Sequence, residues 1–122
     1  MDFHLKELNI LSGSECVIYS VILGNESTSL FESFLNQYYP AYKDEVDNIL
    51  TKIQTIGKHG ALEIYFKLKE GKPGDGVCAL FDEANSNLRL YCIRYDKALL
   101  VIGGGAPKPK NIRAYQQDAK LN

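Results

Sequence analysis

The stretch at residues 88–110, LRLYCIRYDKALLVIGGGAPKPK, constrains the fold more than any other part of the chain. From Leu88 onward apolar residues recur at every second position, and successive side chains of a strand point to opposite faces of a sheet. One face of this strand can therefore join a core, while the other presents Arg89, Tyr91 and Tyr95. A tight turn and a second, wholly apolar run follow, which predicts an antiparallel strand pair inside a sheet.

Two strand-like runs open the chain, and two amphipathic helices are expected after them. The runs at residues 3–10 and 16–23 flank a Ser-Gly-Ser turn, which predicts a β-hairpin or one long strand. Ser29 and Glu32 have the spacing of a capping box, and Pro40 ends the helical pattern that they begin. A second helical pattern follows after a short connection, so the two helices should pack as a hairpin. The apolar residues with helical spacing are Leu30, Phe31, Phe34, Leu35 and Tyr38, then Val46, Ile49, Leu50, Ile53 and Ile56.

The remaining segments complete the expected sheet. Residues 61–69 alternate between apolar and polar side chains, which favours a strand, although a helical turn would also group several of them. Residues 77–81 form a short apolar strand, and a short closing helix is expected at residues 111–118. The order predicts one α+β domain over residues 1–122, in which the helical hairpin covers one face of a mainly antiparallel sheet. The other face is expected to be open and to carry Arg89.

Glycines mark places where the backbone needs special geometry. Gly57 or Gly60 can close the second helix in a left-handed conformation. Gly103-Gly104-Gly105 lack the GxxxxGK[ST] pattern of a phosphate loop. These three glycines therefore predict a strand exit with positive φ, or a close approach of another part of the chain.

Composition limits the classes of function open to these 122 residues. The net charge of -1 argues against a general nucleic-acid-binding protein that relies on bulk charge, but it leaves room for a local basic patch. No apolar run reaches the roughly 18 residues of a membrane-spanning helix, and the first residues lack the apolar segment of a signal peptide. A cytoplasmic protein without membrane contact is therefore expected.

The cysteines and histidines predict neither a metal site nor a bound cofactor. Cys16, Cys78 and Cys92 lie in apolar strand-like runs without a CxxC pair, as buried thiols of a reducing compartment do. His4 and His59 are far apart in the sequence, and no cysteine or acidic residue stands at metal-ligand spacing from them.

Three segments in the second half of the chain follow one another in the pattern of a known family. They are Val77-Cys78-Ala79-Leu80-Phe81-Asp82-Glu83, then Leu88-Arg89-Leu90-Tyr91, then Leu99-Leu100-Val101-Ile102-Gly103-Gly104 followed by Lys108. In this order they resemble the RelE/ParE superfamily of toxins, and most of all its HigB-like branch, over residues 26–118. The chain departs from that branch where Pro109 separates two lysines that are usually adjacent.

The resemblance implies a RelE-like fold and the toxin of a type II toxin–antitoxin pair, acting as a ribosome-dependent, metal-independent mRNA endoribonuclease. In that reaction the ribose 2′-OH attacks the adjacent phosphate, which requires an acid, a base and cations on the phosphorane. The planar guanidinium of Arg89 suits the phosphate oxygens. The implied partners are a helix-turn-helix antitoxin encoded nearby, the ribosome and mRNA. The candidate catalytic residues are Arg89, Tyr91, Arg94 and Lys108, and the candidate RNA-binding residues are Lys67, Lys69, Tyr95 and Lys110.

The sequence is also compatible with two other functions. A RelE-like protein without catalysis, working as a protein-binding or regulatory module, suits the nearly balanced charge. An unrelated small α+β ligand-binding domain would show a large apolar pocket in place of a shallow cationic groove. Each candidate side chain also has an ordinary structural interpretation, since lysines on an edge strand discourage edge pairing and strand arginines are usually solvated.

Overall fold

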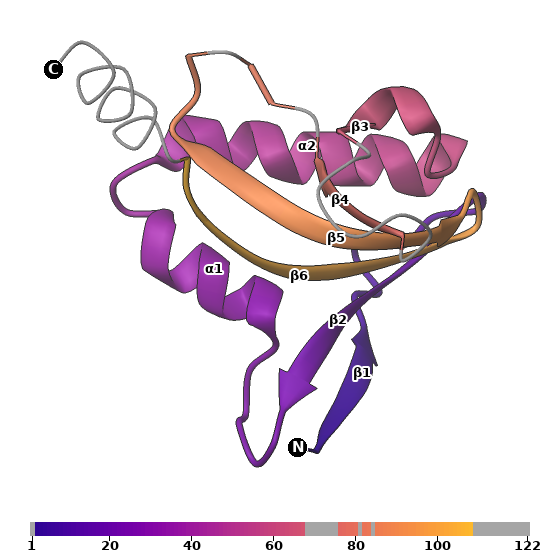
Figure 1. The fold of residues 1–122 in the computed structure, drawn as a ribbon, viewed down its shortest axis with the longest axis horizontal. Helices are drawn as coiled ribbons and strands as arrows, with labels where there is room; N and C mark the ends of the chain where they lie inside the picture. Colours follow the sequence, from indigo (N-terminus) through magenta and orange to yellow (C-terminus); the bar gives the residue numbers. More distant parts are fainter. Residues whose placement is uncertain (1, 68–75, 81, 84, 109–122) are drawn as a thin grey trace, which may run out of the picture.

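The chain folds into a β-sheet with two α-helices along one of its faces (Figure 1). The computed structural model describes residues 2–67, 76–80, 82–83 and 85–108. The described elements are β1 (Phe3–Glu7), β2 (Val17–Leu23), α1 (Leu30–Tyr38), α2 (Lys43–His59), a 3₁₀ turn η1 (Glu63–Tyr65), β3 (Phe66–Lys67), β4 (Val77–Leu80), β5 (Leu88–Asp96) and β6 (Leu99–Pro107). The strands lie in the order β1-β2-β6-β5-β4-β3.

The sheet is antiparallel except where β2 pairs with β6 in parallel. This pairing places Val17 opposite Leu99 and Ser20 opposite Ile102, so the first strands of the chain join the last one. The predicted hairpin is present, because β1 pairs antiparallel with β2 and forms one edge of the sheet. The prediction of an α+β fold with a mainly antiparallel sheet is confirmed.

Local signals in the sequence account for both ends of α1 and for the C-terminal end of α2. Ser29 caps α1 through its side chain, which accepts from the backbone N–H of Glu32, and the Glu32 carboxylate accepts from the backbone of Ser29 in return. The helix ends at Tyr38, before Pro40. Of the two glycines that could close α2, Gly60 does so, with a φ of 99° that L-residues with a side chain rarely adopt.

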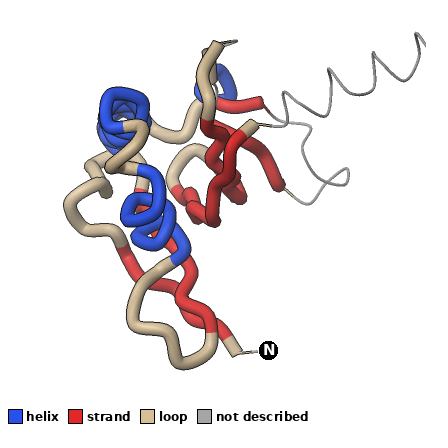
Figure 2. Tube along the Cα trace, turned by 90° about the vertical axis from the view of Figure 1, so that its left-hand side faces the viewer, coloured by secondary structure: helices blue, strands red, loops and turns tan. Residues whose placement is uncertain are grey.

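The core lies between the two helices and the inner face of the sheet, and Figure 2 shows both helices on the same side of the strands. On the helices the alternation of three and four residues turns one stripe inward, and on β5 every second residue faces the same core. The largest fully buried side chains include Phe31, Ile18, Ile53, Ile56, Leu88, Leu90, Leu100 and Ile102. Burying this apolar surface is the main source of the stability of the fold.

Two predicted segments differ from the structure. The strand expected at residues 61–69 begins only at Phe66, because a hydrogen bond from the Tyr65 N–H to the Leu62 carbonyl folds the preceding residues into the 3₁₀ turn. β6 does not end at the three glycines but continues to Pro107, and none of these three glycines has a positive φ. The closing helix expected at residues 111–118 lies outside the described residues.

The three cysteines are buried thiols that form no disulfide, as expected. Cys78 and Cys92 stand directly opposite each other on β4 and β5. Burial raises the pKa of the Cys92 thiol, and the nearby Cys78 raises it further, so the Cys92 thiol remains protonated at neutral pH. None of the described helices is long and apolar enough to cross a membrane.

Candidate functional site

The side chains of β5 alternate between the helix-covered face and the outer face of the sheet. Leu88 and Leu90 are each 1% exposed and pack under the helices, whereas Tyr91 is 37% exposed on the outer face. Arg89 lies between the two leucines and so points to the same outer face as Tyr91. Lys67 of β3 belongs to this surface too, because Lys67, Ala79 and Tyr91 are register partners on three neighbouring strands.

The outer face is not exposed throughout, contrary to the expectation of an open face. Ala79 is fully buried where it lies between Lys67 and Tyr91. Val101 is 4% exposed, and its register partners on the adjacent strands are Tyr19 and Ile93. Small or branched residues in these rows are flanked by longer side chains. The outer face is therefore covered at Ala79 and Val101 and accessible at Tyr91.

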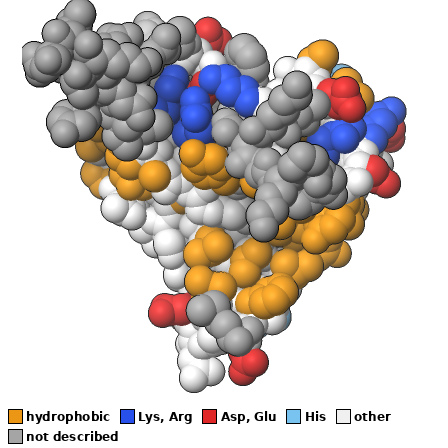
Figure 3. Space-filling view, in the orientation of Figure 1, with side chains coloured by type: hydrophobic (Ala, Val, Ile, Leu, Met, Phe, Trp, Pro, Cys, Tyr) orange, Lys and Arg blue, Asp and Glu red, His pale blue; other side chains and the backbone are white. Residues whose placement is uncertain are grey.

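Three cations lie around the Asp82 carboxylate at one end of the sheet. The Lys67 Nζ lies 2.7 Å from Asp82 Oδ1, and the Lys108 Nζ lies 3.6 Å from the same oxygen. The Arg89 Nε donates to Asp82 Oδ2 at 3.3 Å. Figure 3 shows Lys and Arg side chains gathered on this side of the molecule, next to an apolar area. We call Lys67, Asp82, Arg89 and Lys108 the cationic cluster.

The cationic cluster is assembled from four separate places in the chain. Lys67 ends β3, Asp82 follows β4, Arg89 is the second residue of β5, and Lys108 directly follows β6. Because β3, β4, β5 and β6 are consecutive neighbours in the sheet, their ends can meet at one place. Three of the predicted site residues therefore come together, and the structure adds Asp82, which the sequence did not indicate.

The electrostatics of the cationic cluster keep its carboxylate ionised. Burial alone raises the pKa of Asp82, because its side chain is only 10% exposed. The hydrogen bonds from Lys67 and Arg89 and the charge of Lys108 outweigh burial, so the pKa of Asp82 lies below its ordinary value. The four side chains of the cationic cluster, three cations and one carboxylate, sum to a formal charge of +2.

The three cations differ in how much solvent they meet. The side chains of Lys67, Arg89 and Lys108 are 36%, 18% and 8% exposed. Lys108 also donates from Nζ to the Glu83 carbonyl at 2.9 Å and to Ser86 Oγ at 3.3 Å. Lys67 and Arg89 are therefore the side chains that an incoming anion would meet first, whereas Lys108 lies behind them.

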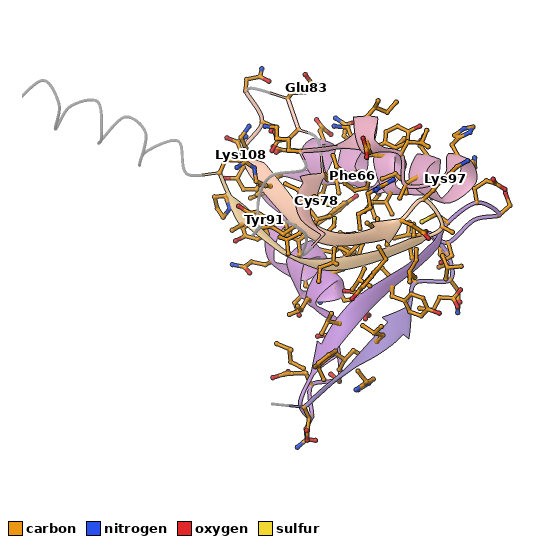
Figure 4. All side chains as sticks on the ribbon, turned by 45° about the vertical axis from the view of Figure 1, so that its right-hand side comes forward. Phe66, Cys78, Glu83, Tyr91, Lys97 and Lys108 are labelled. Atoms are coloured by element: carbon orange, nitrogen blue, oxygen red, sulfur yellow. The ribbon has the colours of Figure 1, made fainter. Side chains whose placement is uncertain are left out.

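The other predicted site residues lie away from the cationic cluster or outside the described residues. Arg94 faces the helix side of the sheet, where its Nε donates to the Ala61 carbonyl. Tyr95 is 63% exposed, but it follows Arg89 by six positions, roughly 20 Å along an extended strand. Figure 4 shows Lys108 and Tyr91 at one end of the sheet and Lys97 at the opposite end. Lys69 and Lys110 are outside the described residues.

A small pocket lies behind the cationic cluster, between α2 and the start of β5. Its volume is about 60 Å³, which is too small for a nucleotide. Glu45 lines it and accepts from the backbone N–H groups of Asn87 and Leu88 at 2.8 and 2.7 Å. Any large ligand of the cationic cluster would therefore bind on the outer surface and not in this pocket. Among the described residues, no group of histidine, cysteine and acidic side chains could hold a metal ion.

Comparisons with known proteins return no match: no family model, no curated protein and no solved structure resembles the chain at a significant level.

Proposed function

We propose that the protein is the toxin of a type II toxin–antitoxin pair and acts as a ribosome-dependent mRNA endoribonuclease. The observation that carries the proposal is the cationic cluster, in which Lys67, Arg89 and Lys108 meet at Asp82. A phosphate of RNA is the anion that such a group of cations on a surface suits, because a guanidinium and an ammonium neutralise its oxygens. The resemblance of the three segments to the HigB-like branch supports the same activity.

The proposed reaction needs only groups that side chains supply. The ribose 2′-oxygen attacks phosphorus and loses its proton to a base, while the bond from phosphorus to the 5′-oxygen breaks and that oxygen takes a proton. The products are a 2′,3′-cyclic phosphate and a 5′-hydroxyl. Lys67 and Arg89 neutralise the charge that grows on the phosphorane oxygens, where such stabilisation counts most. Tyr91, on the same face two residues after Arg89, supplies a phenol that donates a proton or stacks on a base.

The first prediction concerns Arg89. Expression of the wild-type protein alone should arrest growth, and Arg89→Ala should relieve the arrest by lowering mRNA cleavage about 100-fold or more, as loss of a group that stabilises developing charge does in other enzymes. The measurement is cleavage of a defined mRNA in a cell-free translation reaction, mapped by primer extension. Lys58→Ala, which removes one exposed cation from the last turn of α2, is the matched control. Unimpaired growth and intact mRNA with the wild-type protein would contradict the proposal.

A second candidate function is a catalytically inactive RelE-like module that binds another protein. The observation that favours it is β1, an edge strand whose residues are all exposed, including Phe3 at 63% and Leu5 at 48%. Exposed apolar side chains on an unpaired strand edge suit the addition of a strand from a partner. Capture of a small helix-turn-helix protein, with no loss of translation in a cell-free extract, would favour this function over the endoribonuclease.

A further inference from the structure

We propose that Asp82 is the positioning residue of the cationic cluster. It orients the side chains of Lys67 and Arg89, and its negative charge weakens the binding of RNA. This inference rests on the proposed function. It assigns a role to a residue that is not among the candidate site residues predicted from the sequence.

The two carboxylate oxygens of Asp82 contact different cations. One oxygen, Oδ2, takes the Arg89 Nε at 3.3 Å, and the other, Oδ1, takes the Lys67 Nζ at 2.7 Å. A single carboxylate therefore joins a guanidinium from β5 to an ammonium from β3. Long side chains such as these have many rotamers, and fixing them in advance lowers the entropy that a reaction must overcome.

Lys108 forms a further ion pair with Asp82. The Lys108 Nζ lies 3.6 Å from Asp82 Oδ1 and also donates to the Glu83 carbonyl and to Ser86 Oγ. The side chains of Lys108 and Asp82 are 8% and 10% exposed, so this support is largely shielded from solvent. Lys108 contacts Asp82, and Asp82 contacts the two more exposed cations. Lys108 and Asp82 thus act through Lys67 and Arg89.

The negative charge of the same carboxylate also repels an anionic ligand such as RNA. An RNA phosphate that approaches Lys67 and Arg89 meets the negative charge of Asp82 a few ångströms behind them. With the dielectric constant of bulk water, a unit charge at about 5 Å changes a binding constant by a factor of roughly four. Removal of this charge should therefore strengthen RNA binding while it releases the two cations from their fixed positions. Binding and cleavage should change in opposite directions, which a purely structural role would not produce.

The experiment compares the wild-type protein with Asp82→Asn and Asp82→Glu. Binding is measured by fluorescence anisotropy with a labelled single-stranded RNA oligomer over a range of salt concentrations, and cleavage is measured in the cell-free translation reaction. Asp82→Asn should bind RNA roughly threefold to tenfold more tightly, with a steeper dependence on salt, and should cleave mRNA at least about tenfold more slowly. Circular dichroism checks that each variant is folded.

Asp82→Glu separates position from charge, because it keeps the carboxylate and moves it by one methylene. It should bind RNA within about twofold of the wild-type affinity and still cleave more slowly. Asp47→Asn removes a carboxylate from an exposed position on α2 and is the matched control, with binding and cleavage close to wild type. If Asp82→Asn does not fold, the Asp82→Glu result alone tests the proposal.

Two outcomes would overturn the inference, and they can be told apart. If the wild-type protein binds and cleaves RNA but both Asp82 variants match it, or lose binding and cleavage in parallel, the positioning role is wrong and the proposed function stands. If the wild-type protein neither binds the oligomer nor cleaves mRNA, the proposed function is wrong and the role of Asp82 in it falls as well.

Discussion

Asp82 is a partly buried acid that contacts residues far from it in the sequence. Its ordinary surroundings in the chain are a strand end and a polar turn, and neither indicates a partner. In the structure it accepts from the Arg89 side chain of β5, and Lys67 of β3 and Lys108 lie within ion-pair distance of it. These partners lower the pKa of Asp82 against the opposing effect of burial. The carboxylate is therefore part of both the stability of the fold and the charge of the candidate site.

The lowered pKa of Asp82 predicts how stability depends on pH. Because the folded state binds this proton more weakly than the unfolded state does, the contribution of Asp82 is full above its ordinary pKa of 3.8 and is lost as the pH falls through the lower pKa of the folded state. Asp82→Asn should therefore lower the free energy of unfolding by about 1–3 kcal/mol at pH 7. The difference from wild type should shrink below about pH 4. Urea unfolding at pH 7 and at pH 3 measures it, and an unchanged difference would contradict the assignment.

At the scale of single elements, the packing of α1 against β6 explains one of the three consecutive glycines. A Cβ on Gly105 would lie 2.5 Å from the ring of Phe34 and 2.7 Å from the Arg89 carbonyl. Both distances are far inside van der Waals contact, so the helix could not approach the strand with any other residue there. The same Cβ on Gly104 would meet nothing within 4 Å. The sequence indicated a close approach at this run, and the structure shows which glycine it concerns.

This difference between the two glycines is directly testable. Gly105→Ala should lower the free energy of unfolding by about 1–3 kcal/mol, because the methyl group forces Phe34 and the backbone of β5 to shift. Gly104→Ala, which makes the same chemical change one residue away, should alter the stability by no more than about 0.5 kcal/mol. Thermal unfolding of the two variants gives the comparison. Equal effects would show that the contact of Phe34 with Gly105 does not determine the packing.

For the whole molecule, the parallel pairing of β2 with β6 joins the beginning of the chain to its end. Ser20 lies in this pairing and is fully buried. Its hydroxyl donates to the Ile102 carbonyl at 2.7 Å and accepts from the Phe31 N–H at 3.1 Å. One side chain thus links β2, β6 and the first turn of α1. Without it, two backbone groups in the core would lose a partner.

Ser20→Ala should therefore destabilise the whole molecule and not one element alone. We expect the free energy of unfolding to fall by about 1–3 kcal/mol, since a buried carbonyl and a buried N–H each lose a hydrogen bond. Ser27→Ala, at an exposed position in the loop after β2, is the matched control and should have little effect. Hydrogen exchange should also show faster exchange along both β2 and β6. Exchange that increases in β2 alone would contradict the proposed link.

The sequence by itself determined the local structure and the nature of the candidate side chains. Alternation along β5, the capping box at Ser29 and the break at Pro40 depend on neighbours a few residues apart, so they can be read without the fold. The same alternation placed Arg89 and Tyr91 on the face away from the helices. What depends on spacing along the chain was therefore predictable.

Only the tertiary structure decided which of these side chains meet. The strand order places the ends of β3, β4, β5 and β6 together, which brings Lys67 and Lys108 to Arg89 and leaves Arg94 bonded to Ala61 on the other face. Asp82 becomes the centre of this group through contacts with residues far from it in sequence. Pairing between distant strands is set by burial of the whole core, and no local pattern encodes it.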